Sequence, residues 1–274
     1  MCHCEPGGTL AVVTPAERLE RTNFDTFWVP LDGRILDRDD LHVLGCDRAV
    51  PHVNICHRVR ADVARVPALV DEAIAFMSPV CSRFFVTDTF ERGALDRALR
   101  ERGYVDATHA DARIAAPTLE VAHPDDVDVR TVDTLEGIAL HTRLMTRAFG
   151  TDDDPEIVEP ERKLEQCTGE APRTIRYIAH VDGEPVATSG LNWFPTLELA
   201  LLWGGSTLRE ARGRGCYRAM VARRLADAAA MGARFVGLYA VSATSGPIVD
   251  ALGFEKVGDA WFWRPEGAPG PRVD

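Results

Sequence analysis

The alternation of apolar and polar residues is clearest in the second half of the chain. Residues 127–132 alternate with the period of two that is typical of a strand with one exposed face. Apolar residues then recur at helical spacing over residues 135–149, and Asp133 is of a type that can cap the start of this helix. Residues 151–169 predict an acidic turn and a short helix that ends near Gly169.

Residues 174–208 predict an antiparallel meander. Two strand-like runs in residues 174–194 surround the turn at Asp182 and Gly183, and residues 197–208 form a third run. A strand-helix alternation follows, with a helix over residues 216–231, a buried strand over residues 234–241, a short helix and a last strand that reaches residue 264. The pattern predicts an α/β (α+β) fold, in which helices flank a mixed, largely antiparallel central sheet.

The first half of the chain partly repeats this order. Residues 83–107 align with residues 234–260, since both begin with Arg-Phe and reach a glycine followed by an aromatic residue after 20 and 19 residues, respectively. A helix-like run precedes the first copy at residues 66–77, as residues 216–231 precede the second. We interpret this as a duplicated unit. Chance recurrence of such a pattern in α/β proteins is the alternative.

The predicted duplication divides the chain into three parts. Residues 115–126 contain two prolines and no periodicity, so they mark the boundary between the copies. We therefore expect a first domain over residues 1–115 and a second over residues 116–264. Residues 265–274 are rich in Pro and Gly, which predicts a disordered tail.

Composition narrows the classes of protein. The 274 residues carry a formal charge of −11, which argues against general binding to nucleic acid or to an anionic membrane and is compatible with a cationic small molecule. No apolar run approaches the length of about 18 residues that a membrane span needs, and the N-terminus lacks the features of a signal peptide, so we expect a cytoplasmic protein. The sequence is compatible with a homodimer.

Cysteine usage indicates reduced thiols. Seven cysteines, an odd number, are scattered over the chain rather than arranged as a disulfide framework. Cys2, His3 and Cys4 lack the spacing of a zinc site, so we expect no metal.

The most distinctive stretch is LREARGRGCYRAM, residues 208–220. A strand that ends near Leu208, a turn with two glycines and a helix that begins near Cys216 would leave several backbone N–H groups unpaired and pointing the same way, which forms an anion site. Six arginines and one acid, Glu210, lie between Leu208 and Leu225. The turn has neither the lysine of a P-loop nor a dinucleotide-binding fingerprint. A solvated arginine-rich helix face is the alternative.

Residues 127–263 resemble the GNAT superfamily of acyl-CoA-dependent N-acyltransferases. The segment from Arg212 to Tyr217 resembles the superfamily motif Arg/Gln-x-x-Gly-x-Gly/Ala, with Tyr217 where a small residue is usual. Residues 251–254 resemble a second landmark, and the order of elements fits. The tandem arrangement looks like duplicated GNAT proteins, with a degenerate N-terminal copy that has no glycine in residues 54–67, where the motif would stand.

The resemblance implies acetyl-CoA as cosubstrate and the amine of a small molecule as acceptor. The pyrophosphate would bind the N–H groups of residues 213–217, beside Arg212, and the pantetheine would pair with the backbone of Ser206, Thr207 and Leu208. The acyl group would enter a gap between that strand and the strand of residues 234–241. The predicted cofactor-binding residues are Ser206, Thr207, Leu208, Arg212, Gly213, Arg214, Gly215, Cys216, Tyr217 and Ser245.

The general acid and base are less clear. Leu201 and Val249 stand where the superfamily often has a glutamate and a tyrosine. The remaining candidates for a catalytic role are Glu198, Tyr239 and Ser245. Glu198 should face the other side of its strand unless a bulge intervenes. Tyr239 fits a core position better than a catalytic one, and capping of a helix explains Ser245 and Thr244 at least as well as catalysis does. We therefore expect catalysis by positioning. A catalytically silent acyl-CoA-binding sensor is the alternative.

Overall fold

The computed structural model describes residues 13–77, 81–87, 92–151 and 155–268. The first half contains α1 (Pro15–Arg21), β1 (Arg34–Asp37), β2 (Leu41–Gly45), β3 (Ile55–Val59), α2 (Val66–Phe76), β4 (Arg83–Thr87), α3 (Arg92–Glu101) and β5 (Tyr104–Ala115). The second half contains β6 (Val127–Thr131), α4 (Leu135–Phe149), α5 (Pro160–Thr168), β7 (Thr174–Val181), β8 (Glu184–Phe194), β9 (Leu199–Thr207), α6 (Cys216–Ala230), β10 (Phe235–Val241), α7 (Ser245–Ala251) and β11 (Glu255–Pro265). Short 3-10 helices are η1 (Thr22–Phe24), η2 (Pro51–Val53), η3 (Pro195–Leu197) and η4 (Arg209–Ala211).

The strands of the described residues form one sheet of eleven strands, in the order β1-β2-β3-β4-β11-β5-β10-β9-β8-β7-β6. Strands β7 to β9 form the expected antiparallel meander, and β6 extends it by pairing antiparallel with β7. Only β9 with β10 and β3 with β4 pair in parallel. The predicted mixed, largely antiparallel α/β architecture is therefore confirmed.

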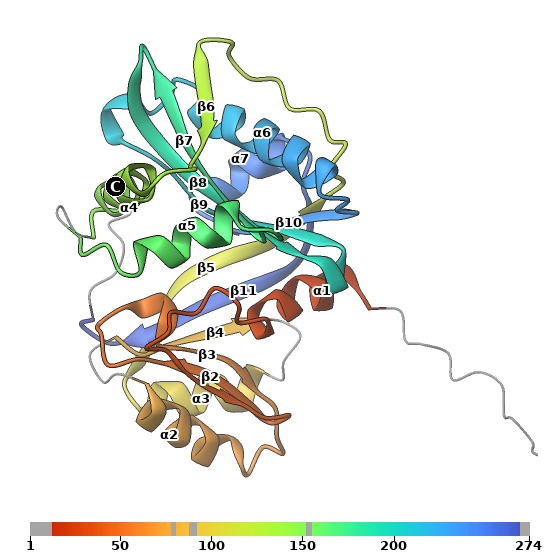
Figure 1. The fold of residues 1–274 in the computed structure, drawn as a ribbon. Helices are drawn as coiled ribbons and strands as arrows, with labels where there is room; N and C mark the ends of the chain where they lie inside the picture. Colours follow the sequence, from red (N-terminus) through yellow and green to blue (C-terminus); the bar gives the residue numbers. More distant parts are fainter. Residues whose placement is uncertain (1–12, 78–80, 88–91, 152–154, 269–274) are drawn as a thin grey trace, which may run out of the picture.

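The two halves exchange their last strands at the centre of this sheet. β5, from the first half, lies between β10 and β11, and β11, from the second half, lies between β4 and β5 (Figure 1). Trp263 of β11 accordingly belongs to the hydrophobic core of the first half, where its side chain is fully buried. Neither half completes its sheet with its own chain alone.

The order of elements confirms the repeat seen in the sequence. Elements β3-α2-β4-α3-β5 recur as β9-α6-β10-α7-β11. The domain boundaries at residues 115 and 264 stay predictions, because β5 and β11 join the halves into one sheet. Pro265, the first residue of the predicted tail, still belongs to β11, and residues 269–274 lie outside the described residues. The Cys-His-Cys triplet at residues 2–4 and part of the predicted acidic turn, residues 152–154, also lie outside them.

Helices cover the two faces of the C-terminal strands. On β7, Tyr177 packs with Val221 and Leu225 of α6, whereas its neighbour Ile178 packs with Ile138 of α4. Adjacent residues of a strand point to opposite faces, so α4 and α6 lie on opposite sides of the sheet. Figure 1 shows α4 with α5 on one side and α6 with α7 on the other.

Two local expectations were wrong. Thr134, not Asp133, caps α4, because its hydroxyl accepts the N–H of Gly137. The second expectation concerns the arginines near the predicted anion site. Arg224 lies on the buried face of α6 and donates to the carbonyl oxygens of Met220 and Gly190, so it does not contribute to that site. Arg223 likewise turns away, to Asp227 and the carbonyl of Val129.

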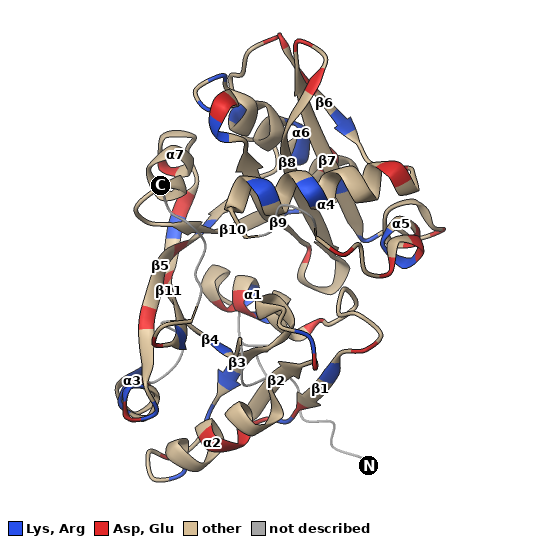
Figure 2. Cartoon of the chain, turned by 90° about the vertical axis from the view of Figure 1, so that its left-hand side faces the viewer, with Lys and Arg blue, Asp and Glu red and all other residues tan. Residues whose placement is uncertain are grey.

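Charged positions of both signs are spread over the described residues (Figure 2). Basic and acidic positions are interspersed over both halves of the ribbon (Figure 2). Within the described residues, no helix combines the length and hydropathy required to cross a bilayer.

Candidate active site

A large cleft of about 1320 Å³ opens where β9, the start of α6 and α7 meet. Nine of the ten predicted cofactor-binding residues line it: Ser206, Thr207, Arg212, Gly213, Arg214, Gly215, Cys216, Tyr217 and Ser245. These residues come from one strand and two helix starts, so the fold brings together what the sequence separates by up to about 40 positions.

The turn before α6 has the backbone geometry of an anion site. Gly213 and Gly215 adopt left-handed conformations, with φ of 81° and 78°, which other residue types rarely adopt. Gly215 is the N-cap of α6, and no side chain caps this end of the helix. The first N–H groups of α6 therefore lie at the cleft without an intrahelical partner, together with the positive end of the helix dipole.

Residues from the predicted boundary segment complete this turn. A Cβ atom on Gly215 would lie 2.5 Å from Cγ of Pro124, whereas a Cβ on Gly213 would meet nothing within 4 Å. Glycine is therefore required at 215 for close packing as well as for φ. Ala122, His123, Pro124 and Asp126 all line the cleft. Sequence reasoning missed them, because this segment carries no motif.

Arg214 is held by two carboxylates. Its guanidinium lies 3.4 Å from Asp126 and 3.3 Å from Asp182, in the turn between β7 and β8, and these hydrogen bonds raise its pKa. Arg218 is exposed at the cleft, in the first turn of α6. The cleft therefore combines positive side chains with one acid, Asp126, that opposes a bound phosphate.

The strands that flank the cleft separate, as the resemblance implies. β9 and β10 pair only from Leu199 to Leu201 on β9, and the remainder of β9 follows β8 alone. A register shift opposite Thr188 and Gly190 places Gly204 in a left-handed conformation with φ of 61°. Such a bulge turns backbone N–H groups out of the ladder, beside the gap.

Leu208 is the one predicted cofactor-binding residue that does not line the cleft. Its N–H donates to the carbonyl of Val186 and is not free for pantetheine, whereas its carbonyl accepts from the N–H of Ala211 and keeps a second lone pair. Its side chain is buried against α4 rather than at the cleft. Ser206 lines the cleft as predicted, and its hydroxyl lies 3.0 Å from that of Thr188.

The location of Glu198 argues against a role as base. It directly precedes β9, at the end of the strand remote from the cleft. Eight residues separate it from Ser206, and an extended strand of that length spans about 26 Å. Its side chain is exposed and pairs with Arg234 at 3.2 Å. It does not line the cleft.

Tyr239 and Ser245 have different surroundings. Tyr239 packs edge-on against Phe85, with ring centroids 4.8 Å apart, and lies outside the cleft lining, which favours a core role. Ser245 lines the cleft at the first turn of α7. Thr244 is the N-cap of α7 but forms no side-chain cap, so the capping alternative is wrong for Thr244.

Leu201 and Val249, which stand where the resemblance would place a base and an acid, also have apolar surroundings. Val249 is fully buried in the core between α7 and the sheet, and Leu201 packs in the apolar cluster on the other face. Cys216 is buried, and burial raises the pKa of its thiol, which makes it a poor nucleophile. The large apolar side chains of Phe149 and Ile248 are exposed at the cleft.

One group of metal-ligating side chains occurs in the described residues. His109, Asp111 and Asp259 lie close together across β5 and β11. Arg113 pairs with Asp111 at 2.9 Å, and the ammonium of Lys256 lies 3.1 Å from Asp111 and 2.6 Å from Asp259, so two cations balance the two carboxylates. This arrangement offers a cation no vacant negative charge.

The comparisons with known proteins identify the fold. A scan against protein-family models and a search of curated proteins found no match. Among solved structures, a GCN5-related N-acetyltransferase from Kribbella flavida is similar over 92% of this chain and 96% of its own, with a TM-score of 0.65 and 19% identity. A GCN5-related N-acetyltransferase from Sphaerobacter thermophilus covers 88% of this chain and 78% of its own, with a TM-score of 0.57 and 16% identity.

A tandem arrangement is found among the similar structures. A tandem GNAT protein from the clavulanic acid biosynthesis pathway is similar over 92% of this chain and 88% of its own, with a TM-score of 0.56 and 15% identity. The chain therefore has the GNAT fold in its tandem form, as the sequence predicted.

Proposed function

We propose that the protein is an acyl-CoA-dependent N-acyltransferase that moves an acetyl or other short acyl group from acetyl-CoA to the amine of a small molecule. The uncapped, glycine-bearing start of α6, at a cleft beside the gap between β9 and β10, carries this proposal. A donor with a charged end and a long, narrow thioester arm fits such a site, because the charged end needs N–H donors and the arm needs a gap in the sheet.

The donor would lie along the cleft. Its pyrophosphate would accept hydrogen bonds from the N–H groups of residues 213–217, and the exposed apolar side chains of Phe149 and Ile248 would contact its less polar parts. The thioester would reach the bulge at Gly204. There, backbone N–H groups freed from the ladder could donate to the carbonyl oxygen as negative charge develops on it.

The chemistry would depend mainly on positioning. A neutral amine attacks the thioester carbon, the new C–N bond forms, and the C–S bond breaks to release a thiolate, while the amine loses its proton to water. A thiol has a pKa near about 8.5, so a thiolate can leave without a protein acid. With apolar Leu201 and Val249, we expect the rate to rise with pH and to follow the pKa of the acceptor amine.

The pH profile can be checked in single variants with a confirmed acceptor. Ser245→Ala, Tyr217→Phe and Tyr239→Phe should each change kcat by less than about a hundredfold and keep the pH limb, because no one side chain supplies an essential proton. A larger loss in one of them, with the limb abolished, would identify that residue as the acid or base.

The first experiment is thiol release from acetyl-CoA with a panel of amines, combined with calorimetric binding of CoA. Arg218→Glu should weaken CoA binding by about tenfold or more, because it replaces attraction with repulsion at the cleft. Arg143→Glu, an exposed residue of α4 outside the cleft lining, changes the net charge equally and should leave affinity nearly unchanged. Equal effects of the two variants would contradict the proposed site.

A catalytically silent acyl-CoA sensor is the second candidate. The apolar residues at 201 and 249 favour it, since a binding module needs no acid or base. Both candidates predict CoA binding that Arg218→Glu weakens, but only the transferase predicts amine-dependent thiol release.

A further inference from the structure

A buried arginine lies directly behind the wall of the cleft, at the bulge in β9. Arg224 comes from α6, and its side chain is fully buried. Gly205 lines the cleft, and a Cβ atom on it would lie 2.9 Å from the ring of Tyr217 and 3.7 Å from Nη2 of Arg224. Gly205 directly follows Gly204, whose left-handed backbone belongs to the bulge. The guanidinium therefore lies immediately behind backbone that borders the cleft.

The guanidinium is held in place on one side and unpaired on the other. Its Nε donates to the carbonyl oxygen of Met220 at 3.0 Å, and its Nη1 donates to that of Gly190 at 3.4 Å. Gly190 pairs with Trp203, next to the bulge. Nη2 of Arg224 is buried and has no hydrogen-bond partner among the described residues. The two bonds thus fix the side chain, and the unpaired edge is the one nearest to Gly205.

The charge of Arg224 is not neutralised by a carboxylate. The only acidic residue of α6, Asp227, accepts from the hydroxyl of Tyr177 at 2.8 Å and from Arg223 at 3.0 Å. Within the described part of the chain, no carboxylate forms an ion pair with Arg224. Burial lowers the pKa of Arg224, but a guanidinium starts from so high a value that it stays protonated at neutral pH. A positive charge without a counter-ion therefore lies inside the protein.

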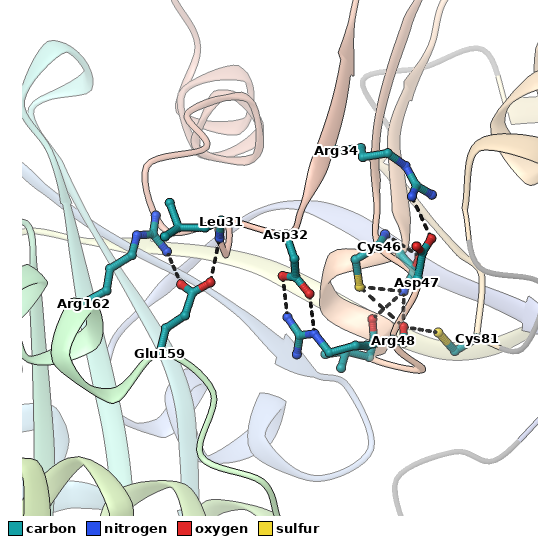
Figure 3. A network of polar contacts seen from close by, with 11 residues as sticks. Leu31, Asp32, Arg34, Cys46, Asp47, Arg48, Cys81, Glu159 and Arg162 are labelled. Atoms are coloured by element: carbon teal, nitrogen blue, oxygen red, sulfur yellow. Dashed lines mark hydrogen bonds and ion pairs between the residues drawn. The ribbon is translucent and has the colours of Figure 1, made fainter.

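Several other arginines of this chain do pair with carboxylates. Arg48 forms a two-point ion pair with Asp32, at 2.6 and 2.8 Å, and Arg34 binds Asp47 at 2.7 Å (Figure 3). A buried charge is costly unless a charged partner or a full set of hydrogen bonds compensates it. An uncompensated arginine beside a reaction centre is therefore typical of a functional position.

A second side chain holds the same bulge from the opposite face of the sheet. His141 of α4 donates from Nε2 to the carbonyl oxygen of Ser189 at 3.0 Å, and Ser189 lies within the register shift between β8 and β9. Nε2 must carry the proton, because a carbonyl oxygen only accepts. Burial lowers the pKa of His141 to about 3, so this imidazole is neutral. Of the two side chains that bond to β8 at the bulge, only Arg224 brings charge.

On the basis of the proposed function, we propose that Arg224 is a positioning residue for acyl transfer, which places positive charge behind the bulge and stabilises the oxyanion of the thioester. When the amine nitrogen attacks the thioester carbon, the π electrons of the C=O bond move onto the oxygen. They return when the C–S bond breaks and the thiolate leaves, while the amine loses its proton to water. Negative charge on the oxygen is largest between these events, so a fixed positive charge favours the transition state over the bound substrate.

Arg224 acts across the backbone and does not touch the thioester. Gly205 lies between the guanidinium and the cleft, and the absence of a side chain there keeps this layer thin. In a protein interior, where water screens little, a charge remains effective over such a layer. This device needs no proton transfer by the protein, which fits the apolar surroundings of Leu201 and Val249.

The first test measures the polarisation of the thioester in the intact protein and needs no acceptor. Acetyl-CoA with an isotopically labelled carbonyl carbon is bound, and infrared difference spectroscopy records its C=O stretching frequency. Positive charge and N–H donors beside the oxygen weaken the C=O bond, so the frequency should lie below that of free acetyl-CoA in water. A frequency equal to the free value or above it would overturn the proposal.

Variants then assign the shift to Arg224. Arg224→Gln keeps a donor for the main-chain carbonyls but removes the charge, so the frequency should return toward the free value. Arg224→Lys keeps the charge and should keep most of the shift. Arg223→Gln is the matched control, because it removes a charge at the next position that Asp227 already neutralises, and it should keep the shift. Circular dichroism checks that each variant folds, and Arg224→Met replaces Arg224→Gln if that variant does not.

A role in packing alone predicts a different pattern. Arg224→Gln and Arg224→Lys would then alter the frequency equally, or neither would alter it, and either result would refute the proposal. With a confirmed acceptor, Arg224→Gln should lower kcat by about tenfold or more and change the Kd of acetyl-CoA by less than about threefold. An equal loss of kcat in Arg224→Lys would also contradict a role of the charge.

The proposal and the proposed function can fail separately. If acetyl-CoA binds but no amine releases thiol, the transferase function fails. The frequency in the binary complex then still decides whether Arg224 polarises the thioester, since a shift that Arg224→Gln removes supports this and a shift that it leaves unchanged refutes it. If amines do release thiol but the frequency does not respond to Arg224→Gln, the function stands and the proposal fails.

Discussion

Asp126 is the residue that most clearly opposes donor binding. It lines the cleft and holds Arg214 from one side, at 3.4 Å. Asp126→Asn should raise the affinity for CoA roughly three- to tenfold, because it removes repulsion from the phosphates and leaves Arg214 freer to turn toward them. Calorimetry at low and at physiological salt measures the change. Asp128→Asn, which removes an exposed carboxylate of β6, is the matched control, and an equal gain in both variants would show that only net charge matters.

Two buried histidines of the first half predict sensitivity to acid. His42 and His57 lie with ring centroids 5.7 Å apart, and burial lowers their pKa values to about 4 and about 3. Between these values and the unfolded value of about 6.5, the unfolded chain binds more protons than the native one, so stability falls as the pH decreases through this window.

The histidine prediction can be measured with urea. From pH 7 to pH 4.5, the free energy of unfolding should fall, and His57→Phe should remove about 2–3 kcal/mol of that fall. Phenylalanine suits the site, since His57 already meets Phe85 edge-on at 5.8 Å. An unchanged pH dependence in the variant would mean that His57 is protonated in the native protein.

At the scale of elements, the exchanged strands make the halves depend on each other. β11 supplies Trp263 to the core of the first half and pairs with both β4 and β5. Trp263→Ala should destabilise the protein by about 3–5 kcal/mol. It should lower the midpoint temperature of a single cooperative unfolding transition that involves both halves. Thermal unfolding and hydrogen exchange measure this. Trp261→Ala, at a partly exposed position, should cost less. Two separate transitions, of which Trp263→Ala moves only one, would contradict the coupling.

At the scale of the whole molecule, we predict one CoA bound per chain. In the first half, α2 corresponds to α6, but it begins after residues 60–65, which contain no glycine, and Pro67 in its first turn lacks an N–H. Titration calorimetry of the full chain should give one equivalent. The full chain is needed, because residues 1–115 alone would lack β11 between β4 and β5. Two equivalents would show that the first half also binds the donor.

The sequence by itself determined the order of elements, the repeat and the turn at residues 212–217. These features depend on local periodicity and on glycine conformations, which a short segment specifies without its neighbours. Even here, single side chains were misjudged: the arginine pattern could not tell Arg224, buried under α6, from Arg218, exposed at the cleft.

Only the tertiary structure decided which strands the two halves share and which distant residues meet. The exchange of β5 and β11, the packing of Pro124 against Gly215 and the pairing of Arg214 with Asp126 all join segments far apart in the chain. Such contacts depend on how the elements pack against one another. The periodicity of a sequence segment indicates which face of that element is apolar, but not which residues of other elements contact that face.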